Sequence, residues 1–158
     1  MATIVDQPAA LPAEPGALLL ALAVARPFSA EFQGVGPVTF APGRYLYVGG
    51  RKSGPGLAEA AARHLEPPAE PLHPIDRVTA HARVAVMLVL PGGDPCRLVE
   101  ILGGWPGLTS VPGFPGEAPC ACRAHLYHMP DDMDLETQAP VFAQAAAART
   151  VFLLKARE

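Results

Sequence analysis

Residues 16–25 form an unbroken run of glycine, alanine, leucine and valine, Gly-Ala-Leu-Leu-Leu-Ala-Leu-Ala-Val-Ala. The run is too short for a transmembrane helix, which needs about 20 apolar residues to cross a bilayer. A secretory signal also needs a positively charged leader, whereas residues 1–15 contain Asp6 and Glu14 and no lysine or arginine. We therefore predict a buried strand over residues 17–25 and no association with a membrane.

The composition indicates one globular domain. A chain of 158 residues can bury one hydrophobic core and hold one active centre. Half of the residues are hydrophobic and 17% are charged, so the 19 prolines and 15 glycines do not indicate a disordered protein. The net charge of −3 limits any nucleic-acid site to a local basic patch. Three cysteines leave one thiol unpaired in any disulfide scheme, which predicts a reducing compartment and a cytoplasmic protein.

Hydrophobic periodicity and turn residues predict strands that alternate with helices. Arg83–Leu90 is a second apolar run, typical of a central strand, and Gly49–Gly56 separates a strand from an alanine-rich helix. The expected strands are 17–25, 36–40, 44–48, 83–90 and 124–129, and the expected helices are 57–65, 95–102 and 140–148, with a short helix or turn at 75–80. Residues 150–154 either add an edge strand or extend the last helix. We expect a loose leader over residues 1–15, a domain over 16–130 and a C-terminal helical extension over 131–158.

The turn between the 44–48 strand and the 57–65 helix is rich in glycine. It matches neither the phosphate loop nor the dinucleotide-binding glycine motif. Basic side chains nevertheless gather near it: Arg51, Lys52, Arg63 and His64, with Glu59 as the opposing charge. Cationic groups at one place on an acidic protein suit a phosphodiester backbone. The alternative is an ordinary solvated helix face.

Several short motifs along the chain resemble a known family. Tyr45–Gly49, Gly54–Leu57 and Arg63–Leu65 resemble the second half of the GIY-YIG nuclease motif. The closer resemblance is to a branch of that superfamily classified as a domain of unknown function and sometimes found beside endonuclease III-like sequences. Its later motifs match here as Pro74-Ile75-Asp76, Gly113-Phe114-Pro115 and Cys120-Ala-Cys122-Arg-Ala-His125-Leu126. The resemblance extends over residues 16–130 in a single order.

The resemblance implies an α/β (α+β) fold, a small mixed and largely antiparallel sheet flanked by helices. In active members, a strand tyrosine helps to activate water, a helical arginine steadies the phosphate and a carboxylate holds a divalent metal ion, Mg²⁺ or Mn²⁺. By this resemblance the candidate catalytic residues are Tyr47, Arg63 and His64. The candidate nucleic-acid contacts are Arg51, Lys52 and Arg63.

The sequence also departs from the family pattern at positions that the chemistry needs. Leu18 stands where the first motif tyrosine belongs, and Ala60 where the phosphate-clamping arginine belongs. Arg63 is three residues from Ala60 on the same helix face and is the first candidate replacement, with Arg51 as the second. The acidic metal ligand of the branch falls at Pro95 or Arg97, so Glu100 is the candidate substitute, with an ordinary exposed glutamate as the alternative.

Cysteine and histidine residues form a second candidate group. Cys96, Cys120, Cys122 and His125 are the right ligand types for a tetrahedral zinc ion. The Cys-x-Cys pair is tighter than in a usual zinc knuckle, and His125 would have to turn back toward the thiols. We therefore expect the thiols to lie close together without a zinc site, as buried thiols near a packed histidine or with one reversible disulfide.

These observations lead to three hypotheses for function. The favoured one is a GIY-YIG-like nucleic-acid-binding domain with degraded or absent endonuclease activity. Its site is expected to be a shallow basic groove with Tyr47, the loop Gly49–Gly56 and the start of the 57–65 helix as one wall. The second is an active metal-dependent, structure-selective endonuclease. The third is a non-catalytic protein-interaction scaffold.

Overall fold

The computed structural model describes residues 2–117 and 120–155. The strands are β1 (Thr3–Val5), β2 (Gly16–Val24), β3 (Phe28–Phe32), β4 (Gly36–Phe40), β5 (Gly43–Arg51), β6 (Arg83–Pro91), β7 (Thr109–Ser110), β8 (Leu126–His128) and β9 (Phe152–Lys155). The helices are α1 (Leu57–Leu65), α2 (Pro74–Thr79), α3 (Pro95–Gly103) and α4 (Leu135–Ala145), with a 3-10 helix at Pro8–Ala10.

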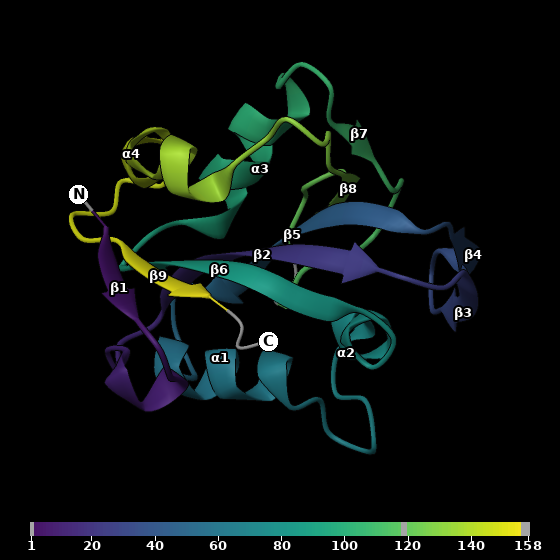
Figure 1. The fold of residues 1–158 in the computed structure, drawn as a ribbon, viewed down its shortest axis with the longest axis horizontal. Coiled ribbons are helices and arrows are strands. Elements are labelled where there is room, and N and C mark those ends of the chain that lie inside the picture. Colours follow the sequence, from purple (N-terminus) through teal and green to yellow (C-terminus); the bar gives the residue numbers. More distant parts are fainter. Residues whose placement is uncertain (1, 118–119, 156–158) are drawn as a thin grey trace.

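Seven of the described strands form one sheet in the order β1-β9-β6-β2-β5-β8-β7. Neighbouring strands are antiparallel except β1 and β9, which are parallel. Helices α1 and α2 cover one face of the sheet, and α3 and α4 cover the other (Figure 1). The predicted fold class, a mixed and largely antiparallel sheet flanked by helices, is confirmed.

Strand β2 lies between β5 and β6 at the centre of the sheet and is buried on both faces. Leu18 and Leu20 pack in the core beneath α1 and α2, whereas Ala17 and Leu19 pack in the core beneath α3 and α4. A strand that is covered on both faces needs apolar side chains at every position, which explains the unbroken run at residues 16–25. None of the helices in the described residues has the length and hydropathy of a transmembrane span.

Strands β3 and β4 form a separate hairpin beside the α1 face (Figure 1). The sequence analysis predicted Gly36–Phe40 as a strand but missed its partner Phe28–Phe32. The hairpin is held by stacked aromatic rings, because Phe28 stacks on Phe40 and Phe32 meets Phe114 edge-on. These contacts between distant residues stabilise a pair of strands that is too short to be stable alone.

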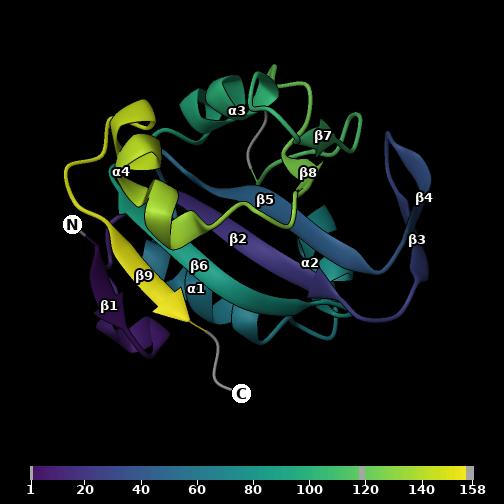
Figure 2. The same ribbon diagram turned by 45° about the horizontal axis from the view of Figure 1, so that its top comes forward.

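The first residues of the chain are ordered by contacts with distant parts of the sequence, unlike the loose leader expected over 1–15. Strand β1 extends the sheet by pairing with β9 (Figure 2). The carbonyl oxygens of Pro12 and Glu14 accept hydrogen bonds from the N–H groups of Ala58 and Leu57 at the start of α1. The amide groups of Leu57 and Ala58 are therefore satisfied within the protein, so these two groups are not available for the anion-binding wall that the sequence analysis predicted.

The C-terminal part is both helical and extended. Helix α4 begins before the predicted start at Pro140, because the Asp134 side chain accepts the Glu136 N–H and caps the helix. Strand β9 was predicted as a possible edge strand but lies between β6 and β1, with Leu153 and Leu154 buried. Both ends of the described chain thus contribute strands to the same sheet.

We expect that Leu20→Ala lowers the free energy of unfolding by about 2–5 kcal/mol, because the change leaves a cavity in the fully buried centre of the sheet. Leu72→Ala is the matched control, since Leu72 is 69% exposed. Denaturant unfolding of both variants checks this. Equal effects of the two substitutions would contradict the central placement of β2.

Candidate functional site

Three polar side chains converge near the end of β5, on the face of the sheet that α1 covers. Tyr47 comes from β5, and Arg63 and His64 come from the last turn of α1. The Tyr47 side chain is fully buried, and its ring meets the His64 ring edge-on at a centroid distance of 6.1 Å. The three candidate catalytic residues therefore lie together, but inside the protein rather than along an open groove.

These side chains surround the carboxylate of Glu117, whose side chain is only 3% exposed. Its Oε2 accepts hydrogen bonds from the Gly50 N–H at 2.6 Å and the Tyr47 hydroxyl at 3.4 Å, and lies 3.6 Å from His64 Nε2. Its Oε1 is 2.5 Å from Arg63 Nη2. Burial alone would raise the pKa of Glu117, but His64, the Gly50 amide and Arg63 outweigh it and hold the pKa well below its usual range.

The glycine pair at the end of β5 makes room for this carboxylate. A Cβ atom on Gly49 would lie 2.3 Å from Glu117 Oε2 and 2.7 Å from Tyr47 Cε2. Gly50 has a φ of +90°, which glycine adopts without strain and which accompanies the turn of its N–H toward Glu117. The Tyr-Val-Gly-Gly sequence thus has a local reason, since any side chain at Gly49 would displace the buried acid.

The charge of Arg63 is balanced within the protein. Its guanidinium lies between Glu117 and Asp76 of α2, with Nε 3.5 Å from Asp76 Oδ1, and the side chain is 16% exposed. Asp76 is itself buried and accepts the N–H groups of Leu72 and His73. Two buried carboxylates face one guanidinium, so this cluster does not present a positive surface to a phosphate.

Burial also disables the tyrosine. The hydroxyl of Tyr47 donates to Glu117, and burial, reinforced by the negative charge of Glu117, raises the pKa of Tyr47 well above its ordinary value. The Tyr47 hydroxyl therefore stays neutral and hydrogen-bonded to Glu117, out of contact with solvent.

Leu18 and Ala60, two of the positions that depart from the family pattern, are apolar and buried in the structure. Leu18 is paired with Gly49 across β2 and β5, and Ala60 is buried in α1. The predicted metal carboxylate, Glu100, lies elsewhere, because it is exposed on α3 and lines two cavities that include neither Tyr47 nor Glu117.

A cavity of about 290 Å³ lies beside Glu117. Its lining residues include the predicted nucleic-acid contacts Arg51 and Lys52. Lys52 is largely exposed, with its side chain 73% accessible, and forms an ion pair of 3.1 Å with Asp94. Arg51 is partly exposed. The accessible positive charge at this end of β5 therefore comes from Arg51 and Lys52 at the cavity, because the charge of Arg63 is balanced by carboxylates in the buried cluster.

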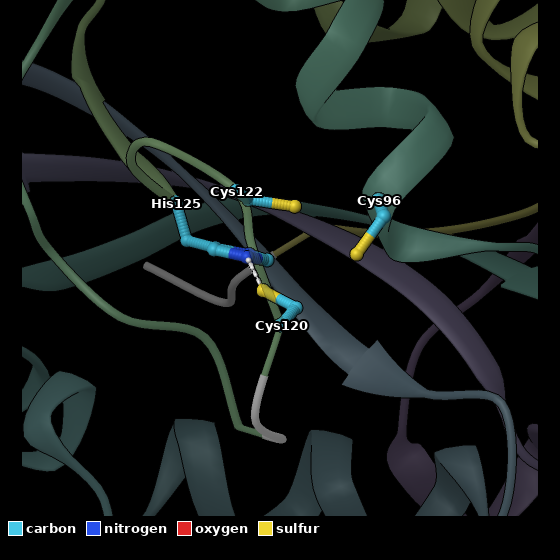
Figure 3. A group of neighbouring side chains, drawn as sticks. All are labelled: Cys96, Cys120, Cys122 and His125. Carbon is cyan, nitrogen blue, oxygen red and sulfur yellow. Dashed lines mark hydrogen bonds between the residues drawn. The ribbon is translucent and has the colours of Figure 1, made fainter.

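Three members of the second candidate group, Cys96, Cys120 and His125, also line this cavity. Figure 3 shows the whole group, which includes Cys122. The ligand atoms of Cys96, Cys120, Cys122 and His125 all lie within 4.8 Å of one another. Cys96 projects from the first turn of α3 toward the other three residues, which come from the segment before β8. Within this Cys3His cluster, Cys120 Sγ lies 3.2 Å from His125 Nε2.

The Cys3His cluster corrects the predicted cofactors. The sequence analysis expected Mg²⁺ or Mn²⁺ if the domain is an active nuclease, and it predicted against zinc because the spacing of the cysteines and His125 is unfavourable. The expectation is wrong, because the fold brings α3 to the cysteine loop and turns His125 toward the thiols. Thiol and imidazole donors suit zinc and not Mg²⁺ or Mn²⁺. All three cysteines are free thiols, in place of the disulfide considered as an alternative.

Comparison with protein-family models matches the domain of unknown function DUF123 to residues 17–147. The chain belongs to the DUF123 family. Comparison with curated proteins and with solved structures gave no significant match. The matched part of the DUF123 domain includes both the cluster around Glu117 and the Cys3His cluster.

The sequence analysis missed Glu117, which is the centre of the polar cluster in this DUF123 domain. One signal was present: Glu117 is the sole acidic residue in the glycine- and proline-rich stretch 103–119. A lone carboxylate in such a loop has no periodicity to mark it, and its partners Gly50 and Arg63 are far away in sequence.

We expect that Glu117→Gln lowers the free energy of unfolding at neutral pH by about 1–3 kcal/mol, because a buried ion pair and two hydrogen bonds to the charged form are weakened. The folded chain holds the pKa of Glu117 below its ordinary value of 4.5, so the stability contributed by the charge is present above that pH. It is lost as the pH falls further, since the unfolded chain then binds the proton first.

Denaturant unfolding of both proteins from pH 7 to pH 3 measures this difference. The gap between wild type and Glu117→Gln should narrow with acidification, whereas Glu31→Gln, an exposed acid in β3, should show no such trend. A gap that widens toward low pH would contradict the assigned charge state.

Proposed function

We propose that this DUF123 domain binds nucleic acid at the cavity beside the end of β5 and has little or no endonuclease activity of its own. The observation that carries the proposal is the convergence of Tyr47, Arg63 and His64 on one carboxylate. These residues come from separate pieces of the motif that resembles the GIY-YIG nucleases. A strand tyrosine, a helical cation and a carboxylate at one place support that resemblance beyond the order of the motifs.

The same geometry argues against efficient hydrolysis. A catalytic tyrosine has to reach its substrate, whereas Tyr47 is inaccessible and donates to Glu117. Arg63 is paired with Glu117 and Asp76, and Leu18 and Ala60 supply no replacement for polar groups. Loss of one electrostatic clamp typically lowers the rate about 10²–10³-fold, so losses at several positions leave little catalysis.

Binding is proposed through the rim of the cavity. Arg51 and Lys52 follow the glycine pair directly and lie at the opening next to Glu117. Phosphate contacts need accessible cations and little else, and the backbone around the glycines allows a close approach. With a net charge of −3 and two cations at the site, the affinity is expected to be modest and strongly dependent on salt. We place the domain in the cytoplasm, where free thiols persist.

We expect a fluorescent single-stranded oligonucleotide to bind with a slope of log affinity against log salt of about −1.4, as for two phosphate contacts on a single strand. The double variant Arg51→Ala/Lys52→Ala should bind about tenfold or more weakly. Arg77→Ala/Arg149→Ala is the control of equal charge, because both residues are exposed elsewhere on the surface. If the two double variants bind alike, or if salt has no effect, the site or the nucleic-acid role is wrong and a protein-interaction scaffold is favoured.

Incubation of the protein with branched and linear DNA and divalent metal ions tests the second half of the proposal. We expect no cleavage that depends on Tyr47. Metal-dependent cleavage by the wild type that Tyr47→Phe abolishes would show instead an active endonuclease.

A further inference from the structure

We infer that Cys96, Cys120, Cys122 and His125 bind one zinc ion, and that this ion fastens the loop carrying Glu117 to the first turn of α3. The inference goes beyond the proposed function, because it does not depend on nucleic acid. It concerns other residues that line the cavity, and it explains what holds Glu117 close to α3.

The first argument is distance. With metal–sulfur bonds of about 2.3 Å and a metal–nitrogen bond of about 2.0–2.1 Å, the ligand atoms of a tetrahedral zinc site lie about 3.6–3.8 Å apart. In the Cys3His cluster all four ligand atoms lie within 4.8 Å of one another, and Cys120 Sγ is 3.2 Å from His125 Nε2. The set closes to a tetrahedron with shifts of about 1 Å or less, which side-chain rotations provide.

The second argument is the orientation of the histidine. His125 Nδ1 lies 3.0 Å from the carbonyl oxygen of Val48 in β5. A carbonyl oxygen only accepts, so Nδ1 carries the hydrogen and Nε2 of the neutral ring keeps its lone pair. That lone pair faces the Cys120 sulfur (Figure 3). A backbone partner on the far nitrogen is the arrangement found around metal-bound histidines.

The position of the ring is fixed further by Gly116. A Cβ atom at Gly116 would lie 2.7 Å from His125 Cε1, so the backbone of this loop packs directly against the imidazole. Glycine is thus required beside the ligand. The contact also links the metal ligand to the residue that immediately precedes Glu117.

The third argument is the thiols. The sulfurs of Cys96, Cys120 and Cys122 lie within 4.8 Å of one another, although α3 supplies the first and the segment before β8 supplies the other two. Packing in a hydrophobic core would not require three thiols and an imidazole from two distant segments to converge on one point. Zinc replaces the thiol protons, and thiolate ligands at a helix N-terminus are additionally stabilised by the helix dipole.

The role of the ion follows from what it connects. Cys96 belongs to α3, whereas the other ligands belong to the segment that leads from Glu117 to β8. His125 is bonded to Val48 and Glu117 to Gly50, both in β5. A zinc ion therefore holds this segment at one end, and the Glu117 carboxylate holds it at the other. Loss of the ion should weaken the hydrogen bond from the Gly50 N–H to Glu117.

The metal is tested by elemental analysis of the full chain purified without chelator, and by replacement with Co²⁺. We expect one zinc per chain and, with Co²⁺, the absorption bands of a tetrahedral site with sulfur-to-metal charge transfer. Cys120→Ser and His125→Ala should weaken zinc binding at least about 10-fold. His128→Ala, an exposed histidine in β8, is the matched control and should retain the ion.

The wild-type Co²⁺ spectrum does not depend on whether the variants fold. If the wild type carries no zinc and takes up neither zinc nor Co²⁺ with thiolate bands, the inferred site is wrong. If both His variants retain the ion equally, His125 is not a ligand.

Hydrogen exchange of the Gly50 amide tests the structural role. On removal of zinc we expect its exchange rate to rise about tenfold or more, with little change at Leu20 in the centre of the sheet. Unchanged protection of Gly50 in the metal-free chain would contradict the role assigned to the ion. Neither result bears on the binding of nucleic acid, so failure here and failure of the proposed function are distinguishable.

Discussion

The burial of the Glu117 carboxylate is the constraint on which the arrangement around β5 depends. A charged acid removed from water costs several kcal/mol unless ion pairs and hydrogen bonds compensate. Here Arg63, His64, the Tyr47 hydroxyl and the Gly50 amide provide that compensation. The requirement accounts for the glycine pair at the strand end and for Arg63 and His64 in the last turn of α1.

The same compensation sets the limits on chemistry. Polar groups that a nuclease would direct at its substrate are directed at one another, and Asp76 adds a second negative charge against Arg63. The cluster around Glu117 contains the residue types of a phosphodiester site, but its side chains are buried and paired with one another. The accessible cations lie one step further along the chain, at Arg51 and Lys52, where the cavity opens. The proposed function thereby separates recognition from catalysis and assigns this domain a binding role instead of hydrolysis.

Much of the fold was predictable because its signals are local. Strand β2 and the alanine-rich helix α1 were predicted from composition and periodicity. The boundaries of the elements next to them were predicted from glycine and proline turn residues. The missed features depend on distant pairing. Strand β1 needs β9, and the hairpin partner Phe28–Phe32 needs the aromatic residues it packs on.

The candidate sites show the same division. Tyr47, Arg63 and His64 were selected from motif spacing, whereas Glu117 could not be, since only the fold brings its loop beneath Gly49 and Gly50. The prediction against zinc was wrong for the opposite reason. The residues of the Cys3His cluster were identified, but their separation along the sequence was taken as a guide to their distance in the fold. A zinc site assembled from a helix and a loop has no fixed sequence interval, and α3 supplies Cys96 from outside the segment that holds the other ligands.

The proposed nucleic-acid contact lies at the cavity lined by Arg51 and Lys52, beside the buried carboxylate of Glu117. Titration of the isotopically labelled chain with a short oligonucleotide, followed by NMR, tests it most directly. The prediction is that chemical shifts move progressively at Gly50, Arg51, Lys52 and Ser53, while the amides of the exposed Glu136 and Val141 on α4 stay unchanged. Chemical-shift changes confined to another surface, or no changes at any oligonucleotide concentration tested, would contradict nucleic-acid binding at this cavity.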